Sequence, residues 1–255
     1  MKPILEINHI KYSYHSLNGE TPAISDISLT VNHGQFISIV GPSGCGKSTL
    51  LSLISGLIKP ESGSISINGQ PIEASNTNIG YMLQKDNLFE WRTVYSNVLL
   101  GLEIQKKITE TSKQTIHNML STYGLNEFKN SKPSQLSGGM RQRVALIRTL
   151  ALEPDILLLD EPFSALDYQT RLEVSDDIGT ILKEQNKTAI LVTHDLSEAI
   201  SMGDIVVVLS NRPCIVKKII PITMSIEHRT PFKSRSAPEF KDYFNQIWEE
   251  LTNND

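Results

Sequence analysis

The N-terminal third of the chain has the hydrophobic pattern of β-strands. Apolar residues alternate with serine and threonine from Ile27 to Val31, as expected of a strand with one buried face. The segments "ILEINHIKYSY" and "SGSISING" predict two further strands, and the second ends in a turn at Asn68–Gly69. The polar segment "HSLNGETP", residues 15–22, predicts a loop. Together these segments predict an N-terminal β region.

A fully apolar strand and an amphipathic helix follow, separated by a glycine-rich loop. Phe36–Val40 reads "FISIV", a continuous apolar run typical of a strand buried on both faces. After the loop, one apolar face recurs at helical spacing. It consists of Leu50, Leu51, Ile54 and Leu57.

From about residue 88 to residue 152 the pattern changes to that of helices. One helix shows a clear apolar face and ends at Gly124, a residue well suited to a helix C-terminus. The face consists of Ile116, Met119, Leu120 and Tyr123.

Three further apolar runs, "DILLLD", "TAILVTH" and "DIVVVLS", alternate with helical segments. The helix between the first two is indicated by Leu172, Ile178, Ile181 and Leu182. Buried strands that alternate with helices predict a parallel sheet covered by helices on both faces. The sequence therefore predicts an α/β fold.

The tail from about Ile222 forms a separate piece. It opens with the polar, proline-containing stretch "HRTPFKSRSAPEF" and ends in a well-formed amphipathic helix. The apolar face of this helix consists of Phe240, Tyr243, Phe244, Ile247, Trp248 and Leu251. We expect the helix to dock on its own domain or on a partner chain. Binding to a membrane surface is a weaker alternative, because the polar face carries acidic residues as well as lysine.

Composition narrows the functional class. The chain has 255 residues, of which 39% are hydrophobic and 20% charged, and a formal net charge of −4, which argues weakly against non-specific nucleic-acid binding. The apolar runs are far shorter than the roughly 20 residues that cross a bilayer. The N-terminus has no signal-peptide pattern, and the two cysteines suggest no disulfide framework. These features predict a cytosolic protein.

The loop "GPSGCGKS" matches the phosphate-binding pattern G-x-x-x-x-G-K-[ST] and has a strand before it and a helix after it. Glycines let backbone N–H groups turn toward phosphate oxygens at the positive end of the helix. We expect Lys47 to reach the β- and γ-phosphates and the Ser48 hydroxyl to bind Mg²⁺. A chance match in a chain of this length has a probability of about one in a hundred. The predicted ATP-binding residues of the loop are Gly41, Pro42, Ser43, Gly44, Cys45, Gly46, Lys47, Ser48 and Thr49.

Cys45 has two interpretations. A thiol near a helix N-terminus can have a lowered pKa and become reactive. The simpler interpretation, which we favour, is a small residue that the loop tolerates.

The segment "DILLLDEP" supplies the usual second half of such a site. Asp160 follows a buried strand and is placed to hold Mg²⁺, and Glu161 is a candidate general base for an attacking water. Two adjacent carboxylates can also simply end a strand. Paired with the phosphate-binding loop, they favour a nucleotide site that uses ATP and Mg²⁺.

A second glycine-rich segment, "LSGGM", opens another helix. Ser137 is placed to cap that helix, and the two glycines after it leave the helix N-terminus sterically open. An ordinary capped helix is the alternative. The predicted anion site consists of Leu136, Ser137, Gly138, Gly139 and Met140.

Taken together, these motifs resemble those of the ATP-binding cassette (ABC) ATPases, over roughly residues 4–220. "LSGGM" followed by "RQR" resembles the family signature, with Met140 where glutamine is usual. Gln84 resembles the Q-loop glutamine, and His194 resembles the switch histidine. "SALD", which ends at Asp167, resembles the D-loop. Tyr14 stands where the family places an aromatic residue that stacks on adenine, although the loop after it is longer here.

The resemblance implies a P-loop NTPase (RecA-like) fold, with a mostly parallel sheet, an antiparallel N-terminal β subdomain and an inserted helical subdomain. The predicted limits are 1–221 for the ATPase domain, about 88–152 for the inserted subdomain and 222–255 for the C-terminal extension. In this family two subunits form a head-to-tail dimer, and the signature of each completes the other's ATP site. Glu161 would then activate water, His194 would hold the γ-phosphate, and Gln84 would contact Mg²⁺ from a hinge.

Within the family, three segments resemble the subunits of bacterial nitrate/sulfonate/taurine-type importers: "KDNLFEWRTVYSNVLLGLE", "LSNRP" and the late "PEF…IWEEL". Glu90 replaces the proline usual there. The resemblance implies two membrane permease subunits as partners, one of which would dock near Gln84–Val98, and indirectly an extracytoplasmic solute-binding protein. No nucleic-acid partner is expected. The implied location is cytoplasmic, on the inner face of the membrane. The alternatives are the detached cassette of an exporter and, less favoured, a soluble ABC ATPase that acts on DNA or ribosomes.

Overall fold

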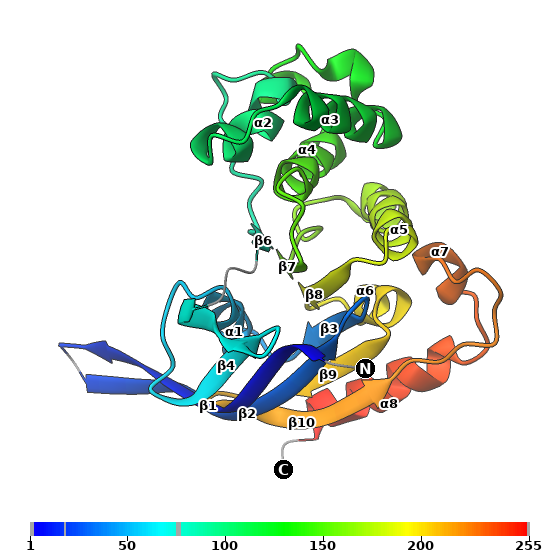
Figure 1. Cartoon of the computed structure of the whole chain (residues 1–255). Helices are drawn as coiled ribbons and strands as arrows, with labels where there is room; N and C mark the ends of the chain where they lie inside the picture. Colours follow the sequence, from blue (N-terminus) through cyan, green and yellow to red (C-terminus); the bar gives the residue numbers. More distant parts are fainter. Residues whose placement is uncertain (1–2, 18, 75–77, 254–255) are drawn as a thin grey trace. The chain divides into compact units, whose positions relative to one another are not determined.

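The structure is a computed structural model that describes residues 3–17, 19–74 and 78–253 (Figure 1). The chain forms two units. Unit 1 combines Met1–Thr77 with Gly179–Asp255, and unit 2 is Asn78–Ile178. Helix α5 (Tyr168–Glu184) carries the chain from unit 2 back into unit 1. The domain limits given above are not tested by this division and stay a prediction.

Unit 1 contains both the N-terminal strands and the last third of the chain. Its elements in chain order are β1 (Pro3–Ser16), β2 (Gly19–Asn32), β3 (Phe36–Val40), α1 (Lys47–Ile54), β4 (Ser62–Ile67), β5 (Gln70–Pro71), the 3-10 helix η1 (Ile72–Ala74), β8 (Thr188–Val192), α6 (Leu196–Met202), β9 (Ile205–Leu209), β10 (Cys214–Pro221), α7 (Pro231–Ser234) and α8 (Phe240–Thr252). Its strands lie in the order β5-β4-β1-β2-β10-β9-β3-β8.

The core strands of unit 1 are parallel, as predicted. β3 pairs in parallel with both β8 and β9. Every residue of β3 and β8 is buried, which explains why their sequences are continuously apolar instead of alternating. The N-terminal strands β1, β2, β4 and β5 pair antiparallel, so the predicted N-terminal β region is confirmed.

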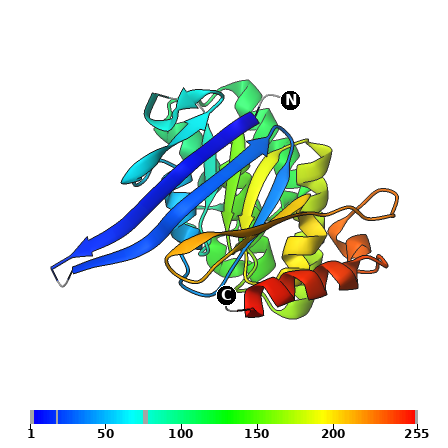
Figure 2. The same ribbon diagram turned by 90° about the horizontal axis from the view of Figure 1, so that it is seen from below.

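The predicted loop over residues 15–22 is wrong for residues 15–16 and 19–22, which lie in strands; Leu17 is in a turn, and residue 18 lies outside the described residues. Strands β1 and β2 form one long antiparallel hairpin whose pairing continues to its tip, where Ser16 pairs with Gly19 (Figure 2). Even Pro22 lies in β2, opposite Ser13. Polar residues predict a loop only where the backbone lacks a partner. Here the backbone hydrogen bonds go to the neighbouring strand, and the polar side chains near the tip, those of His15, Ser16, Glu20 and Thr21, stay exposed to water.

Two other local expectations have different outcomes. The turn at Asn68–Gly69 is confirmed: both residues have positive φ, 53° and 75°, and the turn joins β4 to β5. The face predicted for α1 is only partly right. Leu50, Leu51 and Ile54 are fully buried, but the helix ends at Ile54, and Leu57, beyond that end, is 69% exposed.

The C-terminal helix α8 docks on its own unit, which was one of the two placements expected (Figure 2). Ile247 is fully buried in a cluster with residues of β9, α6 and β10, such as Val206, Ala199 and Ile220. Lys217 of β10 donates to the carbonyl oxygens of Glu250 (2.8 Å) and Asn253 (2.7 Å). A cation therefore lies at the negative end of the helix, where it stabilises the helix dipole.

Unit 2 holds two parallel strands and a group of helices. Its elements are β6 (Ile79–Met82), α2 (Val94–Ile104), α3 (Glu110–Thr122), the 3-10 helices η2 (Asn126–Phe128) and η3 (Pro133–Gln135), α4 (Gly138–Leu150), β7 (Ile156–Asp160) and the first part of α5. The predicted helix with Ile116 and Leu120 on its buried face is α3, and Gly124 follows its C-cap residue Tyr123. Helices α2, α3 and α4 pack together (Figure 1).

Candidate nucleotide site

The glycine-rich loop Gly41–Thr49 joins β3 to α1 in unit 1, as the sequence predicts. Gly44 and Gly46 have φ angles of 74° and 127°, which residues with a Cβ atom rarely adopt. A Cβ atom at Gly46 would also lie only 3.1 Å from Cys214 Sγ and 3.2 Å from Ala23 O. The path of the loop therefore requires glycine at position 46.

The Lys47 side chain holds the loop from within. It is 6% exposed, and its Nζ donates to the carbonyl oxygens of Gly41 (2.8 Å) and Pro42 (2.9 Å). The backbone N–H of Cys45 also donates to the Pro42 carbonyl oxygen, at 3.3 Å. A cation buried beside a loop of backbone N–H groups is suited to binding an anion.

The outer part of the loop is open to solvent. Ser43 and Gly44 at its crest and Ser48 in the first turn of α1 are exposed, whereas Cys45 and Thr49 are buried. A phosphate group can therefore approach the crest and the helix N-terminus, which is the geometry that the motif requires.

Tyr14, the predicted adenine-stacking residue, is connected to this loop. Its hydroxyl shares a 2.9 Å hydrogen bond with Thr49 Oγ1, and its side chain is 44% exposed. Its ring contacts Tyr12 edge-on at 5.1 Å, and the Arg212 guanidinium lies 5.8 Å from its centre. The ring is thus fixed beside the phosphate loop, and adenine stacking on it stays a prediction.

The two thiols of the chain, one in the loop and one beside it, are buried. Cys45 is 1% exposed and Cys214 is fully buried. Burial raises the pKa of the Cys45 thiol, an effect that outweighs the lowering by the nearby Lys47 ammonium. Burial also raises the pKa of Cys214 to about 12. These shifts favour our interpretation of Cys45 as a small structural residue over a reactive thiolate.

His194 lies in unit 1 between β8 and α6, and its side chain is exposed. The residues on either side of it fix the backbone. Thr193 Oγ1 donates to the buried Glu198 carboxylate at 2.7 Å, and Asp195 caps α6 by accepting from Ser197 N and Glu198 N. The histidine is therefore held at a rigid junction between a strand and a helix.

In unit 2, three predicted site residues come together after β6 and β7. Asp160 ends β7 and is 8% exposed, and Glu161 follows it. Gln84, which follows β6, donates through Nε2 to Glu161 Oε2 (3.2 Å) and to Ser164 Oγ (3.4 Å). The pair of Gln84 and Glu161 is thus formed in the structure.

Glu161 also has an unusual backbone. Its φ is 45°, in the left-handed region that is uncommon for residues other than glycine. The Ser164 hydroxyl donates to the Glu161 carbonyl oxygen at 2.9 Å, and Ser164 N donates to the same oxygen at 3.2 Å. Backbone strain that the surroundings hold in place is frequent at functional sites. It supports a functional role for this carboxylate.

Asp167, the predicted D-loop residue, precedes α5 and organises the first turn of that helix. Its carboxylate accepts from Thr170 N at 3.1 Å, and its carbonyl oxygen accepts from Arg171 N at 2.9 Å. Hydrogen bonds from Thr170 hold the pKa of Asp167 below its usual range. The carboxylate is an N-cap in addition to any role at a nucleotide.

The signature segment Leu136–Met140 opens α4, as predicted. Ser137 is the N-cap and accepts from Met140 N at 3.3 Å. A Cβ atom at Gly139 would lie 2.8 Å from Thr170 Cγ2 and 3.1 Å from Val174 Cγ2, so this glycine allows α4 to approach α5 closely. Ser137 and Gly138 are exposed. The helix N-terminus is therefore accessible to an external anion.

Comparisons with known proteins agree with these motifs. Residues 24–164 match the family model described as "ABC transporter". The "Uncharacterized ABC transporter ATP-binding protein YtlC" of Bacillus subtilis (strain 168) is 47% identical over 247 residues, which is 97% of this chain and 95% of YtlC. The chain belongs to the ABC transporter family.

Two further matches describe what this ABC subunit resembles. The "Taurine import ATP-binding protein TauB" of Roseobacter denitrificans is 36% identical over 260 residues, covering 96% of this chain and 94% of TauB. Among solved structures, the dimeric post-hydrolysis state of the ATP-binding cassette MJ0796 bound to ADP and Pi matches with a TM-score of 0.74 at 30% identity. That match covers 86% of this chain and 99% of the other.

Family membership confirms the fold class and the enzyme class. The ABC subunit has an α/β P-loop NTPase fold with antiparallel N-terminal strands, and it is an ATP-binding ATPase. No helix in the described parts of the chain is both long and apolar enough to span a bilayer. Within the same residues, no group of three or more His, Cys, Asp or Glu side chains is arranged to hold a metal ion.

Sequence reasoning missed several residues around the site of this ABC ATPase. Ser164 was read only as part of the D-loop motif, yet it bonds both Gln84 and Glu161. Arg141 belongs to the "RQR" that follows the signature, and no role was predicted for it, yet it binds the carboxylate of Asp86. The spacing of arginines seven residues apart on α4, at Arg141 and Arg148, is the signal that one helix face carries two cations.

Proposed function

We propose that this ABC ATPase powers the import of a small solute, of the taurine, sulfonate or nitrate type or a vitamin precursor. The observation that carries the proposal is the 36% identity to a taurine import ATP-binding protein over 96% of the chain. The aligned region includes the segments outside the nucleotide motifs, and these are the segments that would contact the membrane subunits of a transporter. The solute itself would be selected by other subunits.

For ATP binding, we propose that the loop Gly41–Thr49 holds the phosphates and that Tyr14 stacks on adenine. The Lys47 ammonium now donates to two loop carbonyls, and it would turn toward the β- and γ-phosphates when they are present. The exposed crest of the loop supports this role, because phosphate oxygens can reach its N–H groups.

Mg²⁺ fits the oxygen donors of the proposed ligands. Ser48 offers a hydroxyl, Asp160 a carboxylate at a strand end, and Gln84 an amide oxygen, since its nitrogen makes the two observed hydrogen bonds. Hard divalent cations prefer such oxygen ligands, and in nucleotide sites phosphates supply the others. The bound ion would neutralise charge on the phosphates. It needs few protein ligands, so a dedicated cluster of acidic side chains is not required.

For catalysis, we propose that Glu161 orients and polarises the attacking water, while His194 holds the γ-phosphate. Phosphoryl transfer depends mainly on positioning and charge neutralisation. Gln84 bonds the Glu161 carboxylate and would keep it in place until nucleotide binds. The strained backbone at Glu161 and the fixed junction at His194 support precise placement of both groups.

For energy conversion, we propose a head-to-tail dimer in which Ser137, Gly138 and Gly139 complete the ATP site of the second copy. The exposed, capped N-terminus of α4 supports this role, because it offers backbone N–H groups and the positive end of a helix dipole. Binding of the γ-phosphate closes the dimer, and hydrolysis lets it open.

The partners follow from this scheme. We propose two membrane permease subunits, docked near Gln84–Val98, and an extracytoplasmic solute-binding protein that meets the permease. Phe89 and Trp91 in this segment contact each other with ring centres 4.7 Å apart, and Trp91 is 73% exposed. An aromatic pair with one exposed ring suits a protein contact. The subunit would lie in the cytoplasm, on the inner face of the membrane.

The test is a purification of the tagged Glu161→Gln variant from detergent-solubilised host membranes with ATP, followed by mass spectrometry. We expect near loss of turnover with ATP binding kept, and recovery of a permease with several spans. Wild-type turnover would exclude Glu161 as the base. Recovery of ribosomal or chromosomal proteins without a permease would exclude the importer, and recovery of a permease that exports its substrate would favour the exporter alternative.

A further inference from the structure

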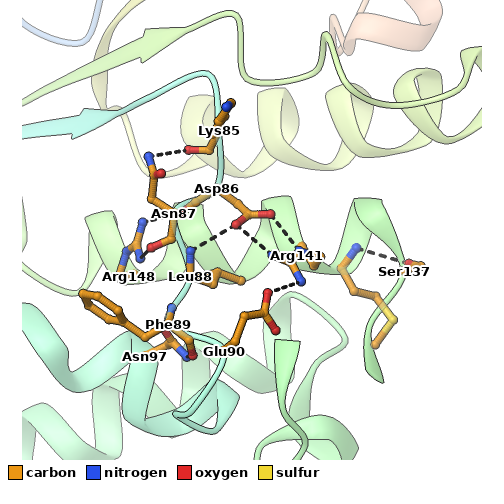
Figure 3. A network of polar contacts seen from close by, with 11 residues as sticks. Lys85, Asp86, Asn87, Leu88, Phe89, Glu90, Asn97, Ser137, Arg141 and Arg148 are labelled. Atoms are coloured by element: carbon orange, nitrogen blue, oxygen red, sulfur yellow. Dashed lines mark hydrogen bonds and ion pairs between the residues drawn. The ribbon is translucent and has the colours of Figure 1, made fainter. Parts of the chain in front are cut away.

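The segment Asp86–Trp91, which follows Gln84, is attached to α4 by the side chain of Arg141 (Figure 3). Arg141 Nε and Nη2 donate to the Asp86 carboxylate at 2.7 and 3.1 Å. Its third nitrogen, Nη1, lies 2.8 Å from Glu90 Oε1. One planar guanidinium thus binds the carboxylates of both Asp86 and Glu90, and it belongs to the residue that directly follows Met140 of the signature.

A second arginine of the same helix binds the backbone of this segment. Arg148 Nη1 donates to Asn87 O at 2.7 Å, and Nη2 donates to Asp86 O at 2.6 Å (Figure 3). Arg148 follows Arg141 by two helical turns, a rise of about 10 Å. Both arginines therefore bind Asp86, Arg141 through the carboxylate and Arg148 through the carbonyl oxygen, which fixes the side chain and the backbone of this residue to α4.

Helix α2 supplies a third attachment. The fully buried Asn97 accepts from Phe89 N at 2.8 Å and donates to Phe89 O at 3.1 Å. Asp86 Oδ1 also accepts from Leu88 N at 3.0 Å. The backbone from Asp86 to Phe89 is therefore held by side chains at nearly every residue, although it lies outside any helix or strand.

The carboxylate of Asp86 keeps its negative charge beside Arg141. Partial burial alone would raise the pKa of Asp86, but hydrogen bonds from Arg141 and Leu88 N–H and the charge of Arg141 lower it below its usual range. The pair therefore stays ionised at physiological pH. Glu90, where the resembling importers have proline, adds a second carboxylate and is half exposed.

We propose that Arg141 is a positioning residue that makes the segment Asp86–Trp91 and the signature segment move as one body. The exposed Trp91 side chain lies at one end of this body, and Ser137 lies one helical turn from Arg141 at the other. A partner that displaces the segment then displaces the N-terminus of α4, and an anion bound there holds the segment. This inference rests on the proposed role of the signature segment at the ATP of a second copy.

The test compares Arg141→Ala with Arg143→Ala, a matched control on the same helix whose guanidinium pairs with Asp177 instead (2.5 Å). In Arg141→Ala we expect amide exchange at Leu88 to rise about tenfold, because its acceptor, the Asp86 carboxylate, loses the hydrogen bonds from Arg141. We expect kcat for ATP to fall about tenfold, while the Kd of a fluorescent ATP analogue stays within about twofold, since the subunit's own phosphate loop is untouched. The control should change neither.

Conservative and double variants separate this role from a merely structural one. Arg141→Lys keeps the charge but cannot bridge both carboxylates, so its kcat should be intermediate. Adding Asp86→Ala to Arg141→Ala removes the carboxylate that has lost its cation, so the double variant should have a kcat close to that of Arg141→Ala alone. If Arg141→Ala does not fold, Glu90→Gln removes only the charge of the exposed carboxylate and should lower kcat about twofold, with slightly faster amide exchange at Leu88.

Two results for Arg141→Ala would overturn the proposal. One is unchanged amide exchange at Leu88, and the other is faster amide exchange together with a wild-type kcat. The measurements use the isolated subunit and no permease. Failure of the importer proposal, which is tested by co-purification, can therefore be told apart from failure of this one.

Discussion

The two glycine-rich segments of this ABC ATPase open helices in the same way but are built on different principles. In the phosphate loop, Gly44 and Gly46 have positive φ, and the buried Lys47 binds the loop's own carbonyl oxygens. In the signature segment neither Gly138 nor Gly139 has positive φ, and Ser137 serves as a cap at an exposed helix end. The loop is a cradle that wraps around its own cation, whereas the signature is an exposed helix end.

This difference indicates how each segment would bind an anion. A cradle that encloses its own cation is complete within one chain. An open helix end has N–H groups and a dipole but no wrapping loop, so it suits an anion that another body presents. The glycines also differ in purpose: Gly46 permits a backbone conformation, and Gly139 permits a close approach between helices.

The largest effect is expected for Gly46→Ala. Both the φ of 127° and the 3.1 Å approach to Cys214 Sγ oppose a Cβ atom there, at a cost of about 2–3 kcal/mol. We expect ATP affinity to fall about 100-fold or more. The matched control is Gly44→Ala, where no atom lies within 4 Å of the added Cβ and only the φ of 74° opposes it, at a cost of about 1 kcal/mol. The affinities are measured by titration with a fluorescent ATP analogue. An equal loss of affinity in the two variants would contradict the role given to Gly46 in the phosphate loop.

Ser137→Asp separates capping from anion binding at the open helix end. Aspartate caps helices as well as serine, so the melting temperature should stay close to that of the wild type. Its charge would repel a γ-phosphate, so turnover should fall about 100-fold while the subunit's own ATP affinity is kept. Ser137→Ala should instead lose about 1 kcal/mol of stability. Normal turnover in Ser137→Asp would show that no anion approaches this helix.

Much of the site could be predicted because its chemistry is local in sequence. The cradle, the N-cap at Ser137 and the strand end at Asp160 depend on residues within one loop or turn, so spacing alone identifies them. The buried strands β3, β8 and β9 were equally clear, because strands covered on both faces have continuously apolar sequences.

The features that sequence reasoning missed depend on distant partners. The hairpin tip looked like a loop because its strands are polar, and only the pairing of Ser16 with Gly19 reveals it. The sequence does not show that Arg141 binds Asp86, because the two residues are 55 positions apart in the chain. Strand β10 was not predicted, because its sequence mixes polar and apolar residues without a clear pattern. Its pairing with β9 stabilises it as a strand.

A smaller effect is expected for Gly139→Ala. The added Cβ would lie 2.8 Å from Thr170 Cγ2, and overpacking of this kind costs about 1–3 kcal/mol. Because α4 must shift away from α5, we expect kcat to fall about tenfold with ATP affinity unchanged. Gly138→Ala is the control for stability, since its Cβ would meet only the end of the Leu166 side chain, at 3.2 Å, so its melting temperature should fall less than that of Gly139→Ala. Thermal unfolding that gives the opposite order would contradict a packing role for Gly139.

The smallest effect concerns the thiols beside the cradle. Since burial raises the pKa of Cys45, its thiolate fraction at pH 7 is lower than that of a free thiol and increases with pH up to and beyond 9. We expect alkylation by iodoacetamide to be slow at pH 7, to speed up with pH, and to be slower still at Cys214, whose pKa is about 12. Rapid modification of Cys45 at pH 7, measured by mass spectrometry, would show that its thiol is accessible to the reagent and contradict its burial.

The most direct test of the central claim, that the signature of one subunit completes the cradle of another, is a mixing experiment. Lys47→Ala has a defective cradle and an intact signature, and Ser137→Asp has the reverse. Each variant alone should be nearly inactive, but their head-to-tail dimer contains one intact site. We predict that an equal mixture recovers about a quarter of wild-type ATP turnover, because half of the random dimers are mixed and each has one active site of two. No recovery in a mixture whose mixed dimers are verified by mass spectrometry would contradict the claim.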